Sequence, residues 1–260
     1  MLNLELILAC LLGGALIGYA GGVLGIGGGL LAIPLLGLIL DMDQQTAQGT
    51  ALIMVVPAVL LTVRQYHRRN HIDFRRAALG AVSSIIFTWL GARLALGMDA
   101  VLLRRIYSVF VMAIALYYFD QSLGFSRRRR RRSDKPRPDP ESFGQLWYIA
   151  VGMMAGLAGG VFGVGGAVLV VPFLTSRMGY SQTGAQGLAL SMIIPGTLVA
   201  LATYAFHGQA TWQIGIPMAI GSLMLVPLGV RLAYRLPENR LKFIFACMLV
   251  LIVTLLLVRA

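Results

Sequence analysis

Two glycine-rich runs are the parts of this sequence whose residue types and spacing are best suited to chemistry. They contain Gly25, Gly27, Gly28 and Gly29 in one half, and Gly163, Gly165, Gly166 and Ala167 in the other. Glycine loses the most freedom when a helix forms, so a helix is expected to unwind at each run. An unwound turn frees backbone N–H groups, and the helix that restarts after it directs a positive dipole end toward them. We therefore interpret both runs as candidate sites for a small anion.

An alternative interpretation of the same glycines is close helix packing. Small residues recur at four-residue spacing, as in Gly14, Gly18 and Gly22, and such spacing lets membrane helices approach closely. A nucleotide-binding loop is excluded, because the run lacks the Lys-Ser/Thr of a Walker A motif and follows no predicted strand. Packing and anion binding both remain open on the sequence alone.

Neutral polar side chains follow each glycine-rich run. We predict that Gln48 and Thr50, with Gln186 and Ser191 in the second half, complete the shell around the anion. Hydrogen bonds between helices are the alternative role for these residues. All ten Asp and Glu residues lie at the edges of apolar blocks or between them, whereas cation sites and most proton relays need a carboxylate inside. This distribution favours an anion over a cation.

Charged residues near the predicted helix ends have a more distant role. Arg93 and Arg231 are expected to extend toward the headgroups, with attraction of anions toward the cavity as the alternative. The three histidines, His67, His71 and His207, fall at loop edges and are not expected to bind metal. We predict no catalytic residues, metal or cofactor, because the chain has no Ser/His pair, no His-Glu-x-x-His and no buried carboxylate pair.

The elements that position these residues must lie in a membrane. Hydrophobic residues make up 58% of the 260 residues and charged residues only 12%, against about 25% in soluble domains. This composition excludes a water-soluble globular protein and a disordered chain. We expect an all-α integral membrane protein in contact with the lipid bilayer.

The chain contains an internal repeat with an offset of 138 residues. Residues 18–36 and 156–174 share 11 of 19 residues without a gap. The same offset aligns Pro57 with Pro195 and Arg93 with Arg231. We predict two homologous repeats, 1–123 and 143–260, joined by a linker at 124–142.

Each repeat is predicted to contain four apolar blocks, giving about eight helices. A single crossing needs about 20 apolar residues, and the first block of each repeat is longer than that. We expect this block to form a helix, a glycine break and a short second helix of about 13 residues. The predicted blocks are 4–40, 44–63, 77–98, 106–123, 145–176, 182–205, 212–234 and 243–258.

Basic residues predict the orientation in the membrane. Short loops rich in Lys and Arg face the cytoplasm, which places 64–76, 231–242 and the Arg/Pro-rich linker there. This pattern requires the first block of each repeat to return to its own side, which makes the two repeats inverted. Arg104 and Arg105 argue against it, and parallel repeats are the alternative. The linker, which includes Arg127–Arg132, is interpreted as a solvated segment near anionic lipid and not as a nucleic-acid site.

These residues resemble a known family. The duplicated Gly-Gly-x-x-Gly-x-Gly-Gly-x-x-x-x-x-Pro stretch is similar to that of the sulfite exporter TauE/SafE family, also called the sulfonate uptake permease family. The resemblance continues through Ala47, Gly49 and Thr50, the basic loop from His67 to Asp73, and Gly-Ala-Arg-Leu at 91–94. It implies a two-repeat, eight-helix transporter of small anions such as sulfite, thiosulfate or short organosulfonates.

The sequence therefore predicts a secondary transporter for a small, sulfur-containing anion in the cell (inner) membrane, and not an enzyme. Two alternatives stay open: a transporter or channel for another small solute, and a membrane scaffold or assembly protein acting through the Arg-rich linker. Which anion is moved, the direction of transport, the coupling ion and the oligomeric state are not specified by the sequence.

Overall fold

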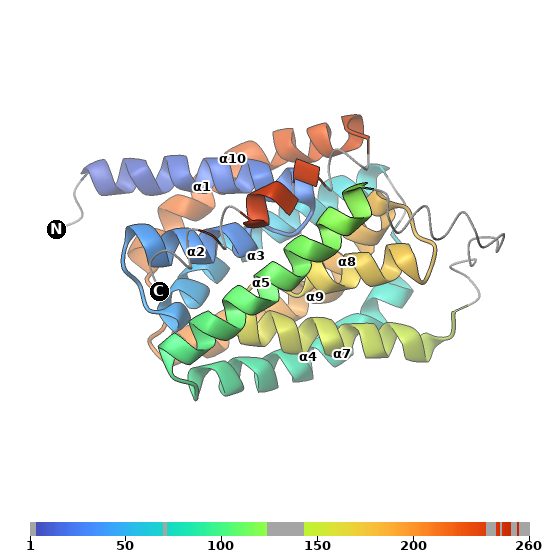
Figure 1. The fold of residues 1–260 in the computed structure, drawn as a ribbon, viewed down its shortest axis with the longest axis horizontal. Helices are drawn as coiled ribbons and strands as arrows, with labels where there is room; N and C mark the ends of the chain where they lie inside the picture. The colour runs from blue at the N-terminus through green and yellow to red at the C-terminus, as the bar shows by residue number, and fades with distance from the viewer. Residues whose placement is uncertain are drawn as a thin grey trace.

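The computed structural model describes residues 4–69, 72–123, 143–237, 243–244, 246–250 and 254, with side chains of 121–123 left out. Within these ranges the protein is helical and forms no strand (Figure 1). The helices of the first half are α1 (Leu4–Leu24), α2 (Gly29–Ile39), α3 (Gln44–Arg69), α4 (Phe74–Leu96) and α5 (Ala100–Leu123). Those of the second half are α7 (Gln145–Phe162), α8 (Ala167–Ser176), α9 (Gln182–Phe206) and α10 (Trp212–Arg235). The linker and half of the block 243–258 lie outside the described residues.

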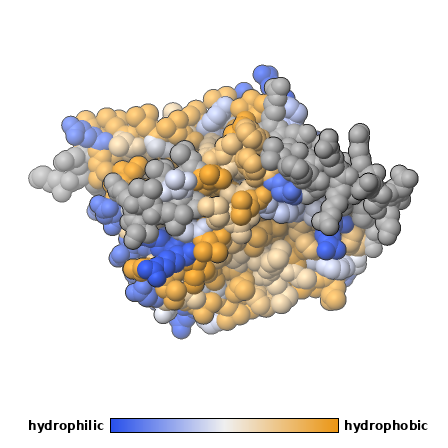
Figure 2. Space-filling view, viewed as in Figure 1, coloured by the Kyte–Doolittle hydropathy of each residue, from blue (hydrophilic) through white to orange (hydrophobic). Residues whose placement is uncertain are grey.

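Seven of the described helices are long and apolar enough to cross a membrane; α2 and α8 are too short. Figure 2 shows hydrophilic residues gathered toward the ends of the helices and a hydrophobic band between them. Large apolar side chains such as Val82, Ile86 and Trp89 are exposed on α4, as expected of a helix that faces lipid. The chain is therefore a multi-pass membrane protein.

The predicted break in the first block of each repeat is confirmed. The α1 and α2 pair is interrupted at Gly25–Gly28, and α7 and α8 at Gly163–Gly166. The short helices have 11 and 10 residues and contain Pro34 and Pro172. The expectation of a helix, a glycine break and a short second helix thus describes both halves.

Two predicted helix starts were wrong. Helix α4 begins at Phe74 and not at 77, because the Asp73 carboxylate accepts the N–H groups of Arg75 and Arg76. Helix α5 begins at Ala100 and not at 106, because Asp99 accepts the N–H groups of Val101 and Leu102 in the same way. Basic residues lie in the first turns of both helices, Arg75 and Arg76 in α4 and Arg104 and Arg105 in α5, so hydropathy alone places the starts too late.

Glycine contacts establish which helices run in the same direction. Along α1 and α10 the pairs advance together, from Gly14 beside Met218 through Gly18 beside Ser222 to Gly22 beside Val226. These two helices are therefore parallel. Along α7 and α4, Gly152 lies against Gly80, Gly156 against Ser84 and Gly160 against Thr88, so they are parallel as well. Both interfaces join the first helix of one half to a helix of the other half.

The central helices α3 and α9 are antiparallel to each other. Gln48 near the start of α3 contacts Tyr204 near the end of α9, and Tyr66 contacts Gln186 in the reverse order. Helix α3 runs with α10, since Thr50 contacts Thr211 and Ile53 contacts Gly215. Helix α9 likewise runs with α4.

One set of helices, α1, α3 and α10, thus points opposite to α4, α7 and α9 (Figure 1). Helices related by the 138-residue offset run in opposite directions, and α1 and α3 are parallel because α2 returns the chain to its starting side. The division into inverted repeats stays a prediction, and these directions support it.

Candidate functional site

The two glycine breaks have the same backbone shape. Six glycines have a positive φ, a conformation that other residues rarely adopt. Their φ values are 64° for Gly25, 76° for Gly27 and 83° for Gly28, and 67° for Gly163, 74° for Gly165 and 71° for Gly166. Each glycine of one break matches a glycine of the other at the 138-residue offset. The predicted glycine positions are therefore the ones the backbone requires.

The two breaks meet in the centre of the molecule. A side chain at Gly29 would lie 3.3 Å from the carbonyl oxygen of Gly163 and 3.4 Å from Cα of Val164. Gly27 lies against Val55 and Val59, beside Pro57 in the middle of α3. Helix α2 therefore begins against the second break, close to the middle of α3.

Buried backbone N–H groups at both breaks have no acceptor within the described part of the chain. In α2 the first hydrogen bonds are those of Leu31 and Ala32 to the Gly28 carbonyl, at 3.1 Å each. The N–H groups of Gly27–Leu30 find no partner there, although these residues are buried. The N–H groups of Val164–Val168 are unpaired in the same way at the start of α8. Unpaired buried N–H groups are rare in proteins, so these clusters call for an acceptor.

The two predicted glutamines lie beside the breaks, and each is held by a tyrosine of the other half. The Tyr66 hydroxyl donates to Oε1 of Gln186 at 2.8 Å, and Nε2 of Gln186 donates to the Leu24 carbonyl at 2.7 Å. The Tyr204 hydroxyl lies 2.7 Å from Oε1 of Gln48 and 3.0 Å from the Gly160 carbonyl. Each pair ties α3 to α9 at one end of the central crossing.

The two glutamine sites differ in one respect. Gln186 uses both ends of its amide, whereas Nε2 of the fully buried Gln48 has no hydrogen-bond partner among the residues that the structure describes. Gln48 packs directly against Gly163, where a side chain on the glycine would lie 2.9 Å from Cβ of Gln48. The glutamine beside the second break therefore has a free side-chain donor, and the glutamine beside the first break does not.

The other two polar residues predicted for the site are engaged elsewhere. The Thr50 hydroxyl accepts the N–H of Thr211 at 3.0 Å, at the connection into α10. The Ser191 hydroxyl donates to the Gly187 carbonyl at 2.8 Å, within its own helix. The structure thus brings the glycines and both glutamines together, but does not direct the hydroxyls of Thr50 and Ser191 at the breaks. Their role as ligands stays a prediction.

Arg93 and Arg231 are exposed near the C-terminal ends of α4 and α10. The guanidinium of Arg93 lies 5.7 Å from the centre of the Trp89 ring, a contact typical of a basic side chain at a membrane interface. Neither residue is part of a glycine break. This placement matches extension toward the headgroups, and attraction of anions from a distance stays a prediction.

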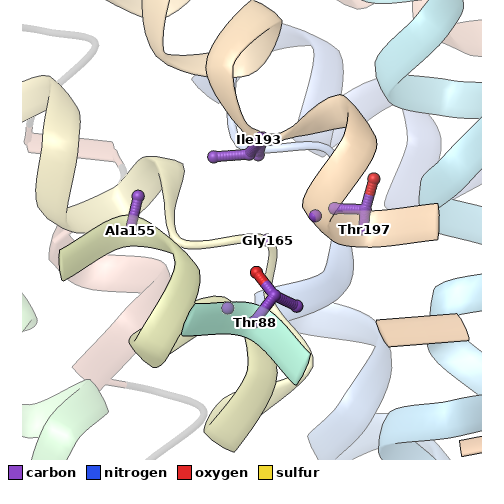
Figure 3. A pocket seen from close by; sticks show the side chains of 7 residues that line it. Thr88, Ala155, Gly165, Ile193 and Thr197 are labelled. Carbon is purple, nitrogen blue, oxygen red and sulfur yellow. The ribbon is translucent and has the colours of Figure 1, made fainter. Parts of the chain in front are cut away.

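Sequence reasoning missed three residues of this region. Tyr66 and Tyr204 hold the glutamines, and their positions are equivalent at the 138-residue offset, which was a usable signal. Thr88 lines a crevice beside Gly165 that is formed by α4, α7 and α9 (Figure 3). Thr88 has no matching threonine in the other half, so the repeat could not reveal it.

The groups at the two breaks are suited to binding a ligand. The breaks offer amide donors, a glutamine amide and hydroxyls, and the described carboxylates lie at helix ends or in connections, far along the chain from both breaks. Among the described residues, His, Cys, Asp and Glu form no group of three that could hold a metal ion. The arrangement suits a small ligand that accepts hydrogen bonds.

Comparison with known proteins agrees with this architecture. The sequence profile of the family described as Sulfite exporter TauE/SafE matches residues 10–256. A probable membrane transporter protein of Methanocaldococcus jannaschii is 23% identical over 252 residues, covering 91% of this chain and 90% of its own length. A probable membrane transporter protein of Xylella fastidiosa is 26% identical, and the match covers 87% of this chain and 85% of its own length. The probable membrane transporter protein YunE of Bacillus subtilis is 20% identical, and the match covers 92% of this chain and 93% of its own length.

The matched residues include both glycine breaks, both glutamines and each of the helices that position them. The relatives are similar to this chain over nearly the whole of their length, which excludes a match limited to one repeat. On the breadth of this match the chain belongs to the sulfite exporter TauE/SafE family of membrane transporters.

Proposed function

We propose that the protein is a secondary transporter that moves a small, sulfur-containing anion such as sulfite, thiosulfate or an organosulfonate across the cell membrane. The observation that carries this proposal is the pair of buried, unpaired N–H clusters at Gly27–Leu30 and Val164–Val168. The start of α2 lies beside the second break, where a side chain at Gly29 would come 3.4 Å from Cα of Val164. The family's description, which names sulfite, supports the choice of a sulfur oxyanion.

An anion is favoured because the unpaired groups of the site are donors at positive dipole ends. A helix N-terminus is equivalent to about half a positive charge, and its free N–H groups point at the ligand. Gln48 adds one more unpaired donor. A cation would meet this positive potential with no carboxylate beside it, so its desolvation would not be offset.

The helix directions suggest how access alternates. If the halves are inverted, one can move against the other around a site fixed at their meeting point. The Tyr66–Gln186 and Tyr204–Gln48 contacts lie at opposite ends of the central helices and link the halves. In the proposed cycle one contact opens while the other stays closed. The Arg/Pro-rich linker then lies in the cytoplasm, where it joins the moving halves.

Flux through the purified protein in liposomes tests the proposal. Uptake of radiolabelled sulfite, thiosulfate, sulfoacetate and taurine is measured, with acetate as a carboxylate control. We expect saturable uptake of at least one sulfur anion by the wild type, and its loss in Gly28→Leu and Gly166→Leu. Gly13→Leu is the matched control, because open space surrounds a side chain there.

Two results would contradict the proposal. Normal flux in both break variants, with normal folding, would mean that the breaks do not form the site. Uptake of acetate without uptake of any sulfur anion would assign the protein to another solute.

A further inference from the structure

The two breaks share a backbone shape but not the same surroundings. The crevice beside Gly165 is lined by Thr88, Ala155 and Gly196, among others. The residues at the matching positions of the first half are Val226, Ile17 and Ala58, all larger or more apolar. These residues bring extra methyl groups to the first break, and a side chain at Gly27 would lie 2.5 Å from Cγ2 of Val59. Repeat symmetry is therefore broken at the point where the ligand is proposed to bind.

Thr88 is the polar side chain that this difference introduces. It is 2% exposed, and its hydroxyl has no hydrogen bond among the described residues. Three other buried threonines bond a carbonyl of their own helix: Thr62 bonds Ala58 at 2.6 Å, Thr197 bonds Ile194 at 2.7 Å and Thr203 bonds Val199 at 2.7 Å. Figure 3 shows the Thr88 oxygen directed toward Gly165, whereas the Thr197 oxygen points away. A buried hydroxyl without a partner requires a ligand that can accept or share its proton.

We propose that the anion binds at one break only, the second, and that Thr88 is a substrate-contacting residue that sets specificity there. This inference rests on the proposed transport of an anion. The unpaired N–H groups at the start of α8, the free Nε2 of Gln48 and the Thr88 hydroxyl all lie on this side. The first break also has unpaired N–H groups, but its glutamine uses both ends of its amide and the position that matches Thr88 is Val226, so we assign it a structural role.

The walls of the crevice indicate which anions fit. Opposite Thr88, the methyl groups of Thr197 and Ile193 lie 3.2 and 2.9 Å from where a Gly165 side chain would begin. The site thus offers donors on one side and apolar carbon on the other. A compact oxyanion, with oxygen atoms on one face, matches these walls better than an anion that also carries an ammonium group. The crevice is narrower than a water molecule here, so binding requires the break and α9 to separate.

Kinetics of sulfite uptake in proteoliposomes test the role of Thr88. We expect Thr88→Val, which keeps the shape of the side chain, to raise KM by roughly ten- to a hundred-fold, as loss of a hydrogen bond to a charged group does. Thr88→Ser should keep KM near the wild-type value, because it retains the hydroxyl. Thr62→Val is the matched control: a buried threonine of α3 with its hydroxyl bonded to its own helix. It should leave KM unchanged.

The outcomes separate this inference from the proposed function. Saturable uptake by the wild type with an unchanged KM in Thr88→Val would overturn the inference and leave the transport proposal standing. Absence of uptake of every sulfur anion by the wild type would overturn both. Thr88→Ala serves as a second variant if Thr88→Val elutes abnormally in detergent. Calorimetric titration with sulfite should give one site per chain, and two equal sites would contradict one-sided binding.

Discussion

At the scale of single residues, the glycines of the breaks are needed for different reasons. Gly166 has a φ of 71°, and a side chain there would overlap the backbone of Ala155. Gly28 has a φ of 83°, but a side chain would reach Ile17 only at 3.1 Å, through a methyl group. Conformational strain is common to both positions, whereas backbone overlap occurs only at Gly166.

We predict that Gly166→Ala lowers stability more than Gly28→Ala does. Strain alone costs about 1–2 kcal/mol in each variant. The overlap with Ala155 adds to that cost in Gly166→Ala. Gly13→Ala is the control, since it meets open space inside a helix and should gain up to about 1 kcal/mol. Thermal unfolding in detergent measures all three, and equal losses at Gly28 and Gly166 would contradict the contact geometry.

The two glutamines are predicted to have opposite roles. Gln186→Leu removes two hydrogen bonds and leaves the Leu24 carbonyl and the Tyr66 hydroxyl unpaired, at about 1–3 kcal/mol for each buried group. Gln48→Leu should cost less stability, because Tyr204 keeps the Gly160 carbonyl as its partner.

Transport kinetics should show the reverse order. The free Nε2 of Gln48 is available to the anion, so Gln48→Leu should raise KM, while Gln186→Leu should mainly lower the melting temperature. Both quantities are measured on the same purified protein. A rise in KM for Gln186→Leu alone would place the substrate at the first break instead.

Sequence reasoning located the glycines and glutamines because their spacing repeats. It did not find their partners, since the choice between a ligand and an interhelical bond depends on what faces Gln48 and Gln186. Thr88 was missed for a related reason. A threonine in an apolar helix gives no sign of a binding role until its neighbours in the structure are known.

At the scale of elements, the start of α2 has a carbonyl group that proline leaves without its usual partner. Pro34 has no N–H, so the Leu30 carbonyl cannot be bonded within the helix. The Tyr107 hydroxyl of α5 donates to that carbonyl at 3.1 Å. Helix α5 also packs Phe110 on Phe162, with ring centres 4.1 Å apart, at the end of α7. It therefore supports both breaks while it crosses in front of them (Figure 1).

We predict that Tyr107→Phe destabilises the protein by about 1–3 kcal/mol, because it leaves a buried carbonyl unpaired. Pro34→Ala should reduce this loss, since the alanine N–H can bond the Leu30 carbonyl in place of the hydroxyl. Unfolding of the two single variants and the double variant forms a mutant cycle. Independent, additive effects would show that Tyr107 does not act through that carbonyl.

The helical blocks and the breaks could be predicted because hydropathy and glycine act locally along the chain. The exact first residues of α4 and α5 could not be predicted, since Asp73 and Asp99 extend these helices through basic residues. The sequence left open whether α2 returns the chain to the side on which α1 begins. The contacts of Gly14, Gly18 and Gly22 with α10 establish how α1 runs, and α2 therefore returns the chain.

At the scale of the whole molecule, helix directions place two connections on opposite faces. The connection before α4 adjoins the start of α9, whereas the connection from α9 to α10 adjoins the start of α3. Positive charges assign the first to the cytoplasm. The second contains no Lys or Arg at 206–211 and is therefore expected outside.

Cysteine labelling in intact cells checks this arrangement. In a chain with Cys10 and Cys247 replaced by alanine, Ala210→Cys should react with an impermeant maleimide added outside. Arg75→Cys should react only after the cells are permeabilised. Reaction of both from the same side would contradict the helix directions, and the reverse pattern would invert the orientation in the membrane.

The parallel packing of α1 on α10 and of α7 on α4 has a consequence for biosynthesis. When α1 leaves the ribosome, the surface that accepts Gly14, Gly18 and Gly22 will not exist until about two hundred more residues have been made, a separation that slows folding. The glycine-lined face of α1 must therefore stay exposed to lipid until the last helices have been made. The amino-terminal half made alone should then be a substrate for quality-control proteases, and co-expression of the missing half should protect it.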